Sequence, residues 1–232
     1  MRQDKQKAIG FRKQGRSYNW IHRKLGIPKS TLSYWFRDPT LSPQAKQNLY
    51  NQGQKKSVAA LVLRNIDQTR IAKERADEIR TAAALEARKF LTNPLFVAGV
   101  SLYWAEGHRR GAAGSRWKCV DFTNADPKIV AVMMRFFREI CQVEEAHFRA
   151  QLIAHQNVQL DRAINFWSGV TKISRKQFIK TSIPIKKKKQ QKGTLTRFNI
   201  LPMGTLHVRV YDVRLFFRVI GWIEGMQGSF SK

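Results

Sequence analysis

The densest group of side chains with a defined chemistry is a run of lysines: Lys186, Lys187, Lys188 and Lys189, with Lys192 shortly after. Ammonium groups at this density bind phosphate oxygens, and each phosphate neutralised steepens the salt dependence of binding by about 0.9 in log K per log salt. The run indicates a loop that adds affinity for a phosphate backbone without reading its sequence. An ordinary solvated loop is the alternative. Arg116 and Lys118, beside a strand-like segment, are similar candidates.

The same excess of positive charge extends over the whole chain. Its 232 residues include 43 Lys and Arg but only 16 Asp and Glu, which gives a formal net charge of +27. Apolar residues make up 43% and aromatic residues 11%, enough to build a core, so the chain is not a disordered basic tail. A field of this sign attracts polyanions. Nucleic acid is the expected partner, and an anionic membrane surface comes second.

Several other classes of protein are excluded by the sequence. No uncharged apolar run reaches the length of about 18 residues that a membrane span needs. Two cysteines, Cys119 and Cys141, are too few for a disulfide framework or a four-thiolate zinc site. The first ten residues lack the apolar run of a signal peptide. We therefore expect a cytoplasmic protein associated with DNA or the nucleoid, with no membrane partner.

Residues 1–41 are predicted to form one small domain of three short helices. The Ser17 hydroxyl can cap the second helix, because it can accept a hydrogen bond from an orphan backbone N–H group. Gly26 ends that helix. Ser30 is expected to cap a third helix over residues 31–37 in the same way.

The segment GRSYNWIHRKLGIPKSTLSYWFRD, residues 15–38, resembles the helix-turn-helix of resolvase-like and transposase-like DNA-binding domains. The resemblance implies that the second helix positions the third in the major groove of double-stranded DNA. A small domain that binds another protein is the alternative. The residues that would reach base edges and phosphates are Lys29, Ser30, Thr31, Ser33, Tyr34 and Arg37.

Residues 42–92 are predicted to form a helical linker between two domains. The segment holds a single glycine, Gly53, and no proline after Pro43, so one long helix or two shorter ones are expected. Its apolar spacing keeps no strict heptad, which argues against a regular coiled coil.

Residues 93–232 alternate between helical and strand-like patterns and are predicted to form a second domain. Asp126 followed by Pro127 marks a helix start, with the aspartate as cap. Asp161 is interpreted as another cap. The expected order is helix 95–105, strand 117–122, helix 128–140, strand 147–153, strand 206–211 and helix 213–226, with an extra helix and basic loop inserted around 160–195.

The segment PLFVAGVSLYWAEGHRR, residues 94–110, resembles the signature helix of the LAGLIDADG homing endonucleases. Gly99 to Gly107 match its nine positions, although Ser101 replaces the usual first glycine and Glu106 the commoner aspartate. The resemblance implies an α+β fold, with an α-β-β-α-β-β-α unit around a saddle-like antiparallel sheet. A stripe of small residues on one helical face would let two such helices pack closely: Ala98, Ser101 and Ala105.

The same resemblance implies a homodimeric, site-specific DNA endonuclease, since the chain has one such helix and a symmetric site needs two. Glu106 of each subunit would be the catalytic carboxylate and would bind Mg²⁺, and hydrolysis of two phosphodiester bonds would give a staggered double-strand break. Asp121 is a weaker metal candidate, because a residue of an alternating strand can simply face solvent.

Two other functions fit the same residues. Some LAGLIDADG domains joined to a helix-turn-helix are catalytically silent transcription regulators, and here Glu106 would be an ordinary residue at a helix end. A transposon or phage accessory protein that binds DNA or RNA ends is the third hypothesis, so RNA is not excluded as a partner. Loss of cutting in Glu106→Gln with retained binding would separate the first hypothesis from the other two.

Overall fold

The computed structural model describes residues 4–37, 41–155, 158–183 and 201–230. It is an α+β structure of two compact units, residues 1–72 and 73–232. The boundary between the units falls inside one long helix, α4 (Pro43–Phe90). The second part of the expected linker therefore belongs to the second unit. The lysine run at 186–189 and Lys192 lie outside the described residues.

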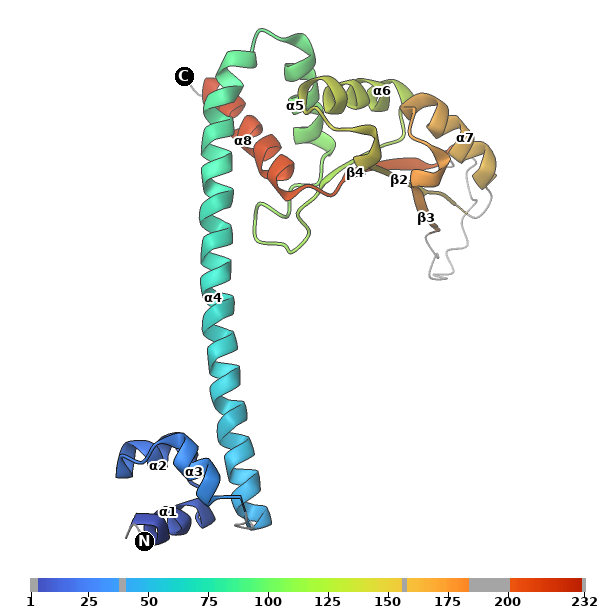
Figure 1. Cartoon of the computed structure of the whole chain (residues 1–232). Helices are drawn as coiled ribbons and strands as arrows, with labels where there is room; N and C mark the ends of the chain where they lie inside the picture. Colours follow the sequence, from blue (N-terminus) through green and yellow to red (C-terminus); the bar gives the residue numbers. More distant parts are fainter. Residues whose placement is uncertain (1–3, 38–40, 156–157, 184–200, 231–232) are drawn as a thin grey trace, which may run out of the picture. The chain divides into compact units, whose positions relative to one another are not determined.

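The first unit begins with three short helices, α1 (Asp4–Lys13), α2 (Tyr18–Leu25) and α3 (Lys29–Trp35), which is the number predicted (Figure 1). The Ser17 hydroxyl caps α2 by accepting from the Trp20 N–H at 3.2 Å, and Gly26 ends the helix at φ 68°. The expected Ser30 cap is wrong: α3 starts after Pro28, whose carbonyl accepts the first helical hydrogen bond, from the Leu32 N–H at 3.1 Å. The buried core of these helices is Ala8, Ile21, Ile27, Leu32 and Phe36.

Helix α4 is one continuous helix of 48 residues, and its last turns pack against α8 (Val213–Phe230). The packing is close because α8 has glycines there: a Cβ on Gly221 would lie 2.4 Å from the carbonyl oxygen of Arg80. Arg218 of α8 also donates to Glu86 of α4 at 2.7 Å. Residues 73–90 are therefore part of the second unit's core. None of the described helices is long and apolar enough to cross a membrane.

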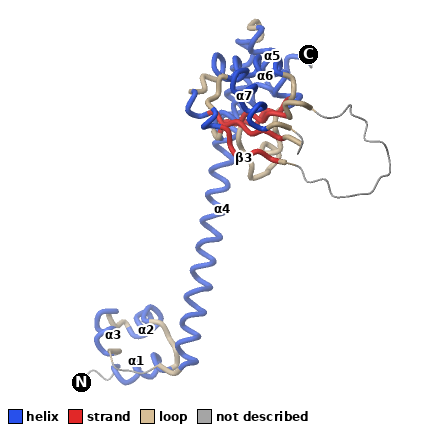
Figure 2. Tube along the Cα trace, turned by 90° about the vertical axis from the view of Figure 1, so that its right-hand side faces the viewer, coloured by secondary structure: helices blue, strands red, loops and turns tan. Residues whose placement is uncertain are grey.

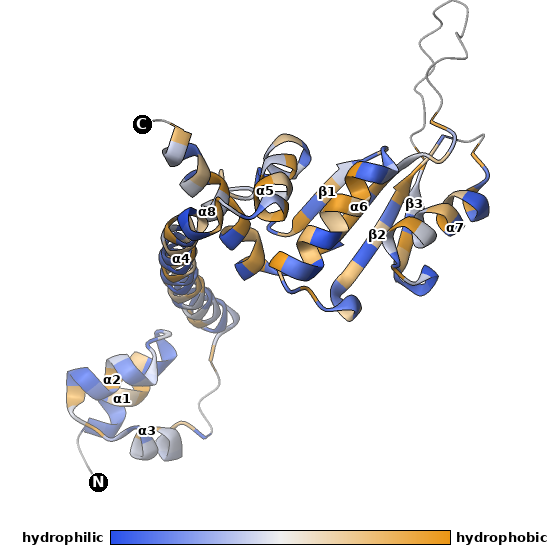
Figure 3. Cartoon of the chain, turned by 90° about the horizontal axis from the view of Figure 1, so that it is seen from above, coloured by the Kyte–Doolittle hydropathy of each residue, from blue (hydrophilic) through white to orange (hydrophobic). Residues whose placement is uncertain are grey.

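The second unit is built on a four-stranded sheet in the order β1-β4-β2-β3. The strands are β1 (Val120–Asn124), β2 (Phe148–Ile153), β3 (Phe178–Ser182) and β4 (Thr205–Val210). Helices α5 (Pro94–Glu106), α6 (Pro127–Arg135) and α7 (Leu160–Thr171), together with α8, lie on one side of it (Figures 1 and 2). Seen from above, α6 lies over the sheet between β1 and β2 (Figure 3). In the two central strands, β2 and β4, every second residue is buried: Phe148, Ala150, Leu152, Leu206, Val208 and Val210.

The expectation of an antiparallel sheet is wrong. Strand β4 pairs antiparallel with β1 and β2, but β3 runs parallel to β2, so the sheet is mixed. Two parallel neighbours need a crossover, and α7 supplies it with Ala163 and Trp167 buried. The helix expected as an insertion is thus part of the core. The expected Asp161 cap is wrong: α7 begins at Leu160, and Asp161 lies inside its first turn, where it accepts from Arg175 at 2.7 Å. A single described strand, and not two, separates α5 from α6.

Helix α5 lies against a π-helical turn, η1 (Phe136–Ile140), and Gly99 makes this approach possible. A Cβ on Gly99 would lie 2.1 Å from Cδ2 of Phe136. Gly99→Ala should therefore lower the free energy of unfolding by about 2 kcal/mol, as overpacking of a full core does. Urea unfolding measures the change. Gly169→Ala in the exposed part of α7, where a Cβ meets nothing within 4 Å, is the control and should be neutral or slightly stabilising. Equal stability of the two variants would refute close packing at Gly99.

Candidate nucleic-acid interface

Helix α3 presents a polar, positively charged face. Leu32 and Phe36 are buried in the first unit's core, which leaves the opposite side uncovered. The candidate residues on that side are exposed except Thr31, which is half-buried: Lys29, Ser30, Ser33, Tyr34 and Arg37. The Arg37 guanidinium lies 5.4 Å from the centre of the Tyr34 ring. An exposed helix face of this kind can place cations and hydroxyls against base edges and phosphates.

The turn before α3 is fixed by His22 of α2. Its Nδ1 lies 2.7 Å from the carbonyl oxygen of Ile27, within the turn. The histidine is therefore a structural residue that helps to set the approach of α3.

The second unit has a second polar surface, on the side of the sheet that the helices leave open. Strand residues alternate between the two sides, and the register aligns the polar ones in rows across the strands. In one row Asp121 of β1 pairs with Arg209 of β4, and Arg209 pairs with Arg149 of β2. The next row consists of Thr123, His207 and Gln151. We call this side of the sheet the open face.

A buried carboxylate organises the open face. Asp121 is only 6% exposed; its Oδ2 accepts from Arg209 Nε at 2.8 Å, and its Oδ1 lies 2.9 Å from His207 Nδ1. Thr123 Oγ1 also lies 2.9 Å from that nitrogen. Burial alone raises the pKa of the Asp121 carboxyl, but the hydrogen bonds and charges of His207 and Arg209 outweigh it and hold the pKa below its ordinary value. The weaker metal candidate is thus already engaged with two other side chains.

Asp121 makes the second unit sensitive to acid. Because its pKa is lowered by folding, the charged carboxylate stabilises the fold above the unfolded-state pKa of about 3.9, and this stabilisation is lost as the pH falls through the lower folded-state value. At pH 7, Asp121→Asn should lower the free energy of unfolding by about 3 kcal/mol, because Arg209 loses its carboxylate. Urea unfolding between about pH 7 and pH 2 should then show a smaller acid-induced loss in the variant than in the wild type. An equal loss in both would contradict the assignment.

Glu106 lies at the edge of the open face. It is the last residue of α5, and the following Gly107 forms a β-bridge with Phe122 of β1. The buried Tyr103 hydroxyl fixes this junction by accepting from the Asp121 N–H at 3.3 Å and donating to the His108 carbonyl at 3.2 Å. The Glu106 side chain is exposed, and it has no hydrogen bond or ion pair with any described residue.

The small residues of α5 are largely uncovered in the single chain. Ser101 and Ala105 are exposed and Ala98 is half-buried. Ser101 Oγ lies 4.0 Å from Met226 Sδ of α8, which is a weak contact. No group of three or more His, Cys, Asp or Glu side chains that could hold a metal ion occurs among the described residues.

Arg116 and Lys118, the two basic candidates before β1, lie in different surroundings. Arg116 is exposed, but the Lys118 ammonium lies 5.7 Å from the Phe217 ring centre of α8, within the helical layer. Lys118 is therefore not brought to the open face. Arg149, His207 and Arg209 were not among the residues predicted for a site. Polar side chains at alternate strand positions, such as His207 and Arg209 of β4, are the signal that would have found them.

Comparison of the chain with protein-family models, with curated proteins and with solved structures found no match. The two resemblances rest on the motif residues at 15–38 and 94–110. The mixed sheet, with one described strand between α5 and α6, departs from the unit that the second resemblance implies.

Proposed function

We propose that this protein binds double-stranded DNA at specific sites. Helix α3 reads base edges in the major groove, and the open face of the second unit binds backbone phosphates. The observation that carries the proposal is the exposed side of α3, where Lys29, Ser33 and Arg37 follow a capped helix and a fixed turn. This is the arrangement by which a helix-turn-helix presents its recognition helix.

The charges of the second unit support a phosphate contact. Arg149 and Arg209 occupy one row of the open face, and main-chain carbonyls of Ala146 and Phe148 hold the Arg149 guanidinium, each at 2.7 Å. Held in this way, the guanidinium can donate its remaining N–H groups with little loss of side-chain entropy. Such contacts add affinity and orientation but carry no sequence information.

Salt titration of binding tests the phosphate contact. Binding of a labelled duplex to the full chain, followed by fluorescence anisotropy, should weaken with a slope of about −5 in log K against log salt, and Arg149→Ala should reduce that slope by about 1. Arg162→Ala removes the same charge from an exposed position of α7. It is the control and should leave the slope unchanged. A slope near zero, or equal effects of the two variants, would refute the proposed contact.

DNA cleavage by a homodimer is the second candidate function, and the exposed carboxylate of Glu106 favours it. Mg²⁺ is commonly bound by one or two carboxylates together with substrate phosphates, so a free carboxylate beside a phosphate-binding face fits the ion. Asp121 does not fit, because His207 and Arg209 engage both of its oxygens. When bound at Glu106, Mg²⁺ would supply positive charge that polarises the scissile phosphate. The uncovered residues Ser101 and Ala105 are the proposed contact between two α5 helices.

A further inference from the structure

Two exposed aromatic side chains lie at one end of the open face. Trp117, just before β1, is 42% exposed, and Tyr211, just after β4, is 57% exposed. Their rings are 6.0 Å apart in an edge-to-face arrangement. Most other large aromatic side chains described in this unit, among them Trp167 and Trp222, are buried in its core. Exposure of two adjacent aromatic rings from separate segments of the chain to water is unfavourable, and such an exposed patch indicates a binding site.

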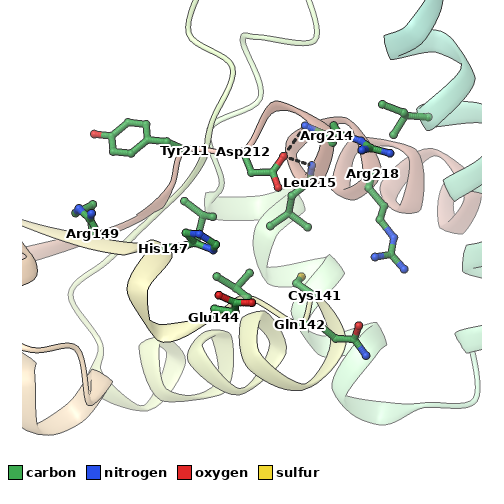
Figure 4. Close-up of a pocket in the computed structure, with 13 residues that line it drawn as sticks. Cys141, Gln142, Glu144, His147, Arg149, Tyr211, Asp212, Arg214, Leu215 and Arg218 are labelled. Carbon is green, nitrogen blue, oxygen red and sulfur yellow. Dashed lines mark hydrogen bonds between the residues drawn. The ribbon is translucent and has the colours of Figure 1, made fainter.

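Arginine side chains lie beside this pair and along a cavity next to it. Arg209, anchored by Asp121, lies over the Trp117 ring, 5.7 Å from its centre. A cavity of about 700 Å³ adjoins Tyr211. In Figure 4, Tyr211 and Arg149 lie at one end of the cavity, while Arg214 and Arg218 come from α8 at the other. Arg218 is neutralised by Glu86, whereas Arg214 is exposed and forms no ion pair with a described residue.

We infer that this end of the open face binds unpaired nucleotides of the target DNA, with a base stacked on the Tyr211 ring beside Trp117 and its phosphates at Arg149 and Arg214. Paired bases hide their faces inside the duplex, so only an unpaired base can stack on a protein ring. Aromatic rings set among arginines match a ligand that is both planar and anionic. The inference rests on the proposed function in taking DNA as the ligand, and it adds that the second unit prefers DNA that is locally opened.

Two labelled duplexes of the same sequence test this inference, one fully paired and one with a bulge of unpaired thymines. Fluorescence anisotropy with the full chain should show tighter binding of the bulged duplex. The double variant Trp117→Ala/Tyr211→Ala should lose about tenfold or more in affinity for the bulged duplex and change little for the paired one. Trp117→Phe/Tyr211→Phe keeps both rings and should retain the preference. Phe230→Ala, which removes an aromatic ring 72% exposed at the end of α8, is the matched control.

The outcomes separate this inference from the proposed function. If the wild type binds both duplexes equally, or if the alanine pair weakens both by the same factor, the inference is wrong and duplex binding stands. A third outcome is that the wild type binds the bulged duplex but not the paired one, and the alanine double variant does not bind the bulged duplex. In that case the inference stands and the proposed function is wrong. Thermal unfolding of each variant checks that the fold is retained.

Discussion

Replacing Lys29, Ser33 and Arg37 together by alanine should lower the affinity for the cognate duplex about a thousandfold and leave a residual, salt-sensitive affinity for any duplex. The factor is the lower end of the usual ratio between specific and non-specific DNA binding, about 10³ to 10⁷. The three side chains lie on the exposed side of α3, so their removal leaves the core of Ile21, Leu32 and neighbours intact. Competition binding against duplexes of unrelated sequence measures the ratio.

The control is a second triple variant, which removes the same number of positive charges and hydroxyl groups from α4 instead. Lys55, Lys56 and Ser57 are consecutive exposed residues of α4, and their replacement by alanine also removes two positive charges and one serine. This control should reduce affinity for all sequences modestly and leave the specificity ratio unchanged. If the α3 variant and the control reduce specific and non-specific binding alike, α3 is not the reading helix.

Glu106→Gln should abolish DNA cutting, by about a thousandfold or more in rate, and leave duplex binding within about twofold. The amide keeps the size of the side chain but removes the negative charge that binds Mg²⁺, and a metal ion supplies several kcal/mol of charge stabilisation to such a reaction. The side chain is exposed and makes no hydrogen bond with a described residue, so the fold should not change. Conversion of supercoiled plasmid in the presence of Mg²⁺ or Mn²⁺ is the measurement.

Glu139→Gln is the control for the cutting assay. Glu139 is an exposed carboxylate whose partner is Arg135 on the helical side of the unit, so its replacement should leave cutting unchanged. A wild-type protein that binds its site but never cuts would exclude the endonuclease and leave the transcription regulator. Equal cutting by the wild type and by Glu106→Gln would show that the catalytic carboxylate lies elsewhere.

Local features of this fold could be predicted from sequence because neighbouring residues determine them. Ser17 caps α2 and Asp126 caps α6, since a side-chain oxygen two or three residues before an orphan N–H group needs no tertiary context. The predicted end of the second helix at Gly26 is confirmed for the same reason. The sheet direction was not predictable in this way, because the parallel pairing of β3 with β2 depends on contacts of α7 across the whole unit.

The residues of the candidate site likewise separate into those that local sequence determines and those that long-range contacts bring together. The exposed side of α3 and the position of Glu106 at a helix end follow from periodicity and local signals. The engagement of Asp121 does not, because its partners His207 and Arg209 are 86 and 88 residues away in sequence and reach it only through the pairing of β1 with β4. The juxtaposition of Trp117 with Tyr211 depends on that same pairing. Long-range strand register, which no single segment encodes, therefore decides what the open face can bind.

Selection of duplexes from a random-sequence pool by the full chain is the most direct test of site-specific DNA binding. The account predicts that repeated rounds enrich one sequence motif, which is bound at least about a thousandfold more tightly than unselected duplex at physiological salt. It further predicts that the Lys29, Ser33 and Arg37 alanine variant enriches nothing. A wild-type pool that stays random, with equal affinity for every duplex, would contradict site-specific recognition and leave only charge-driven binding.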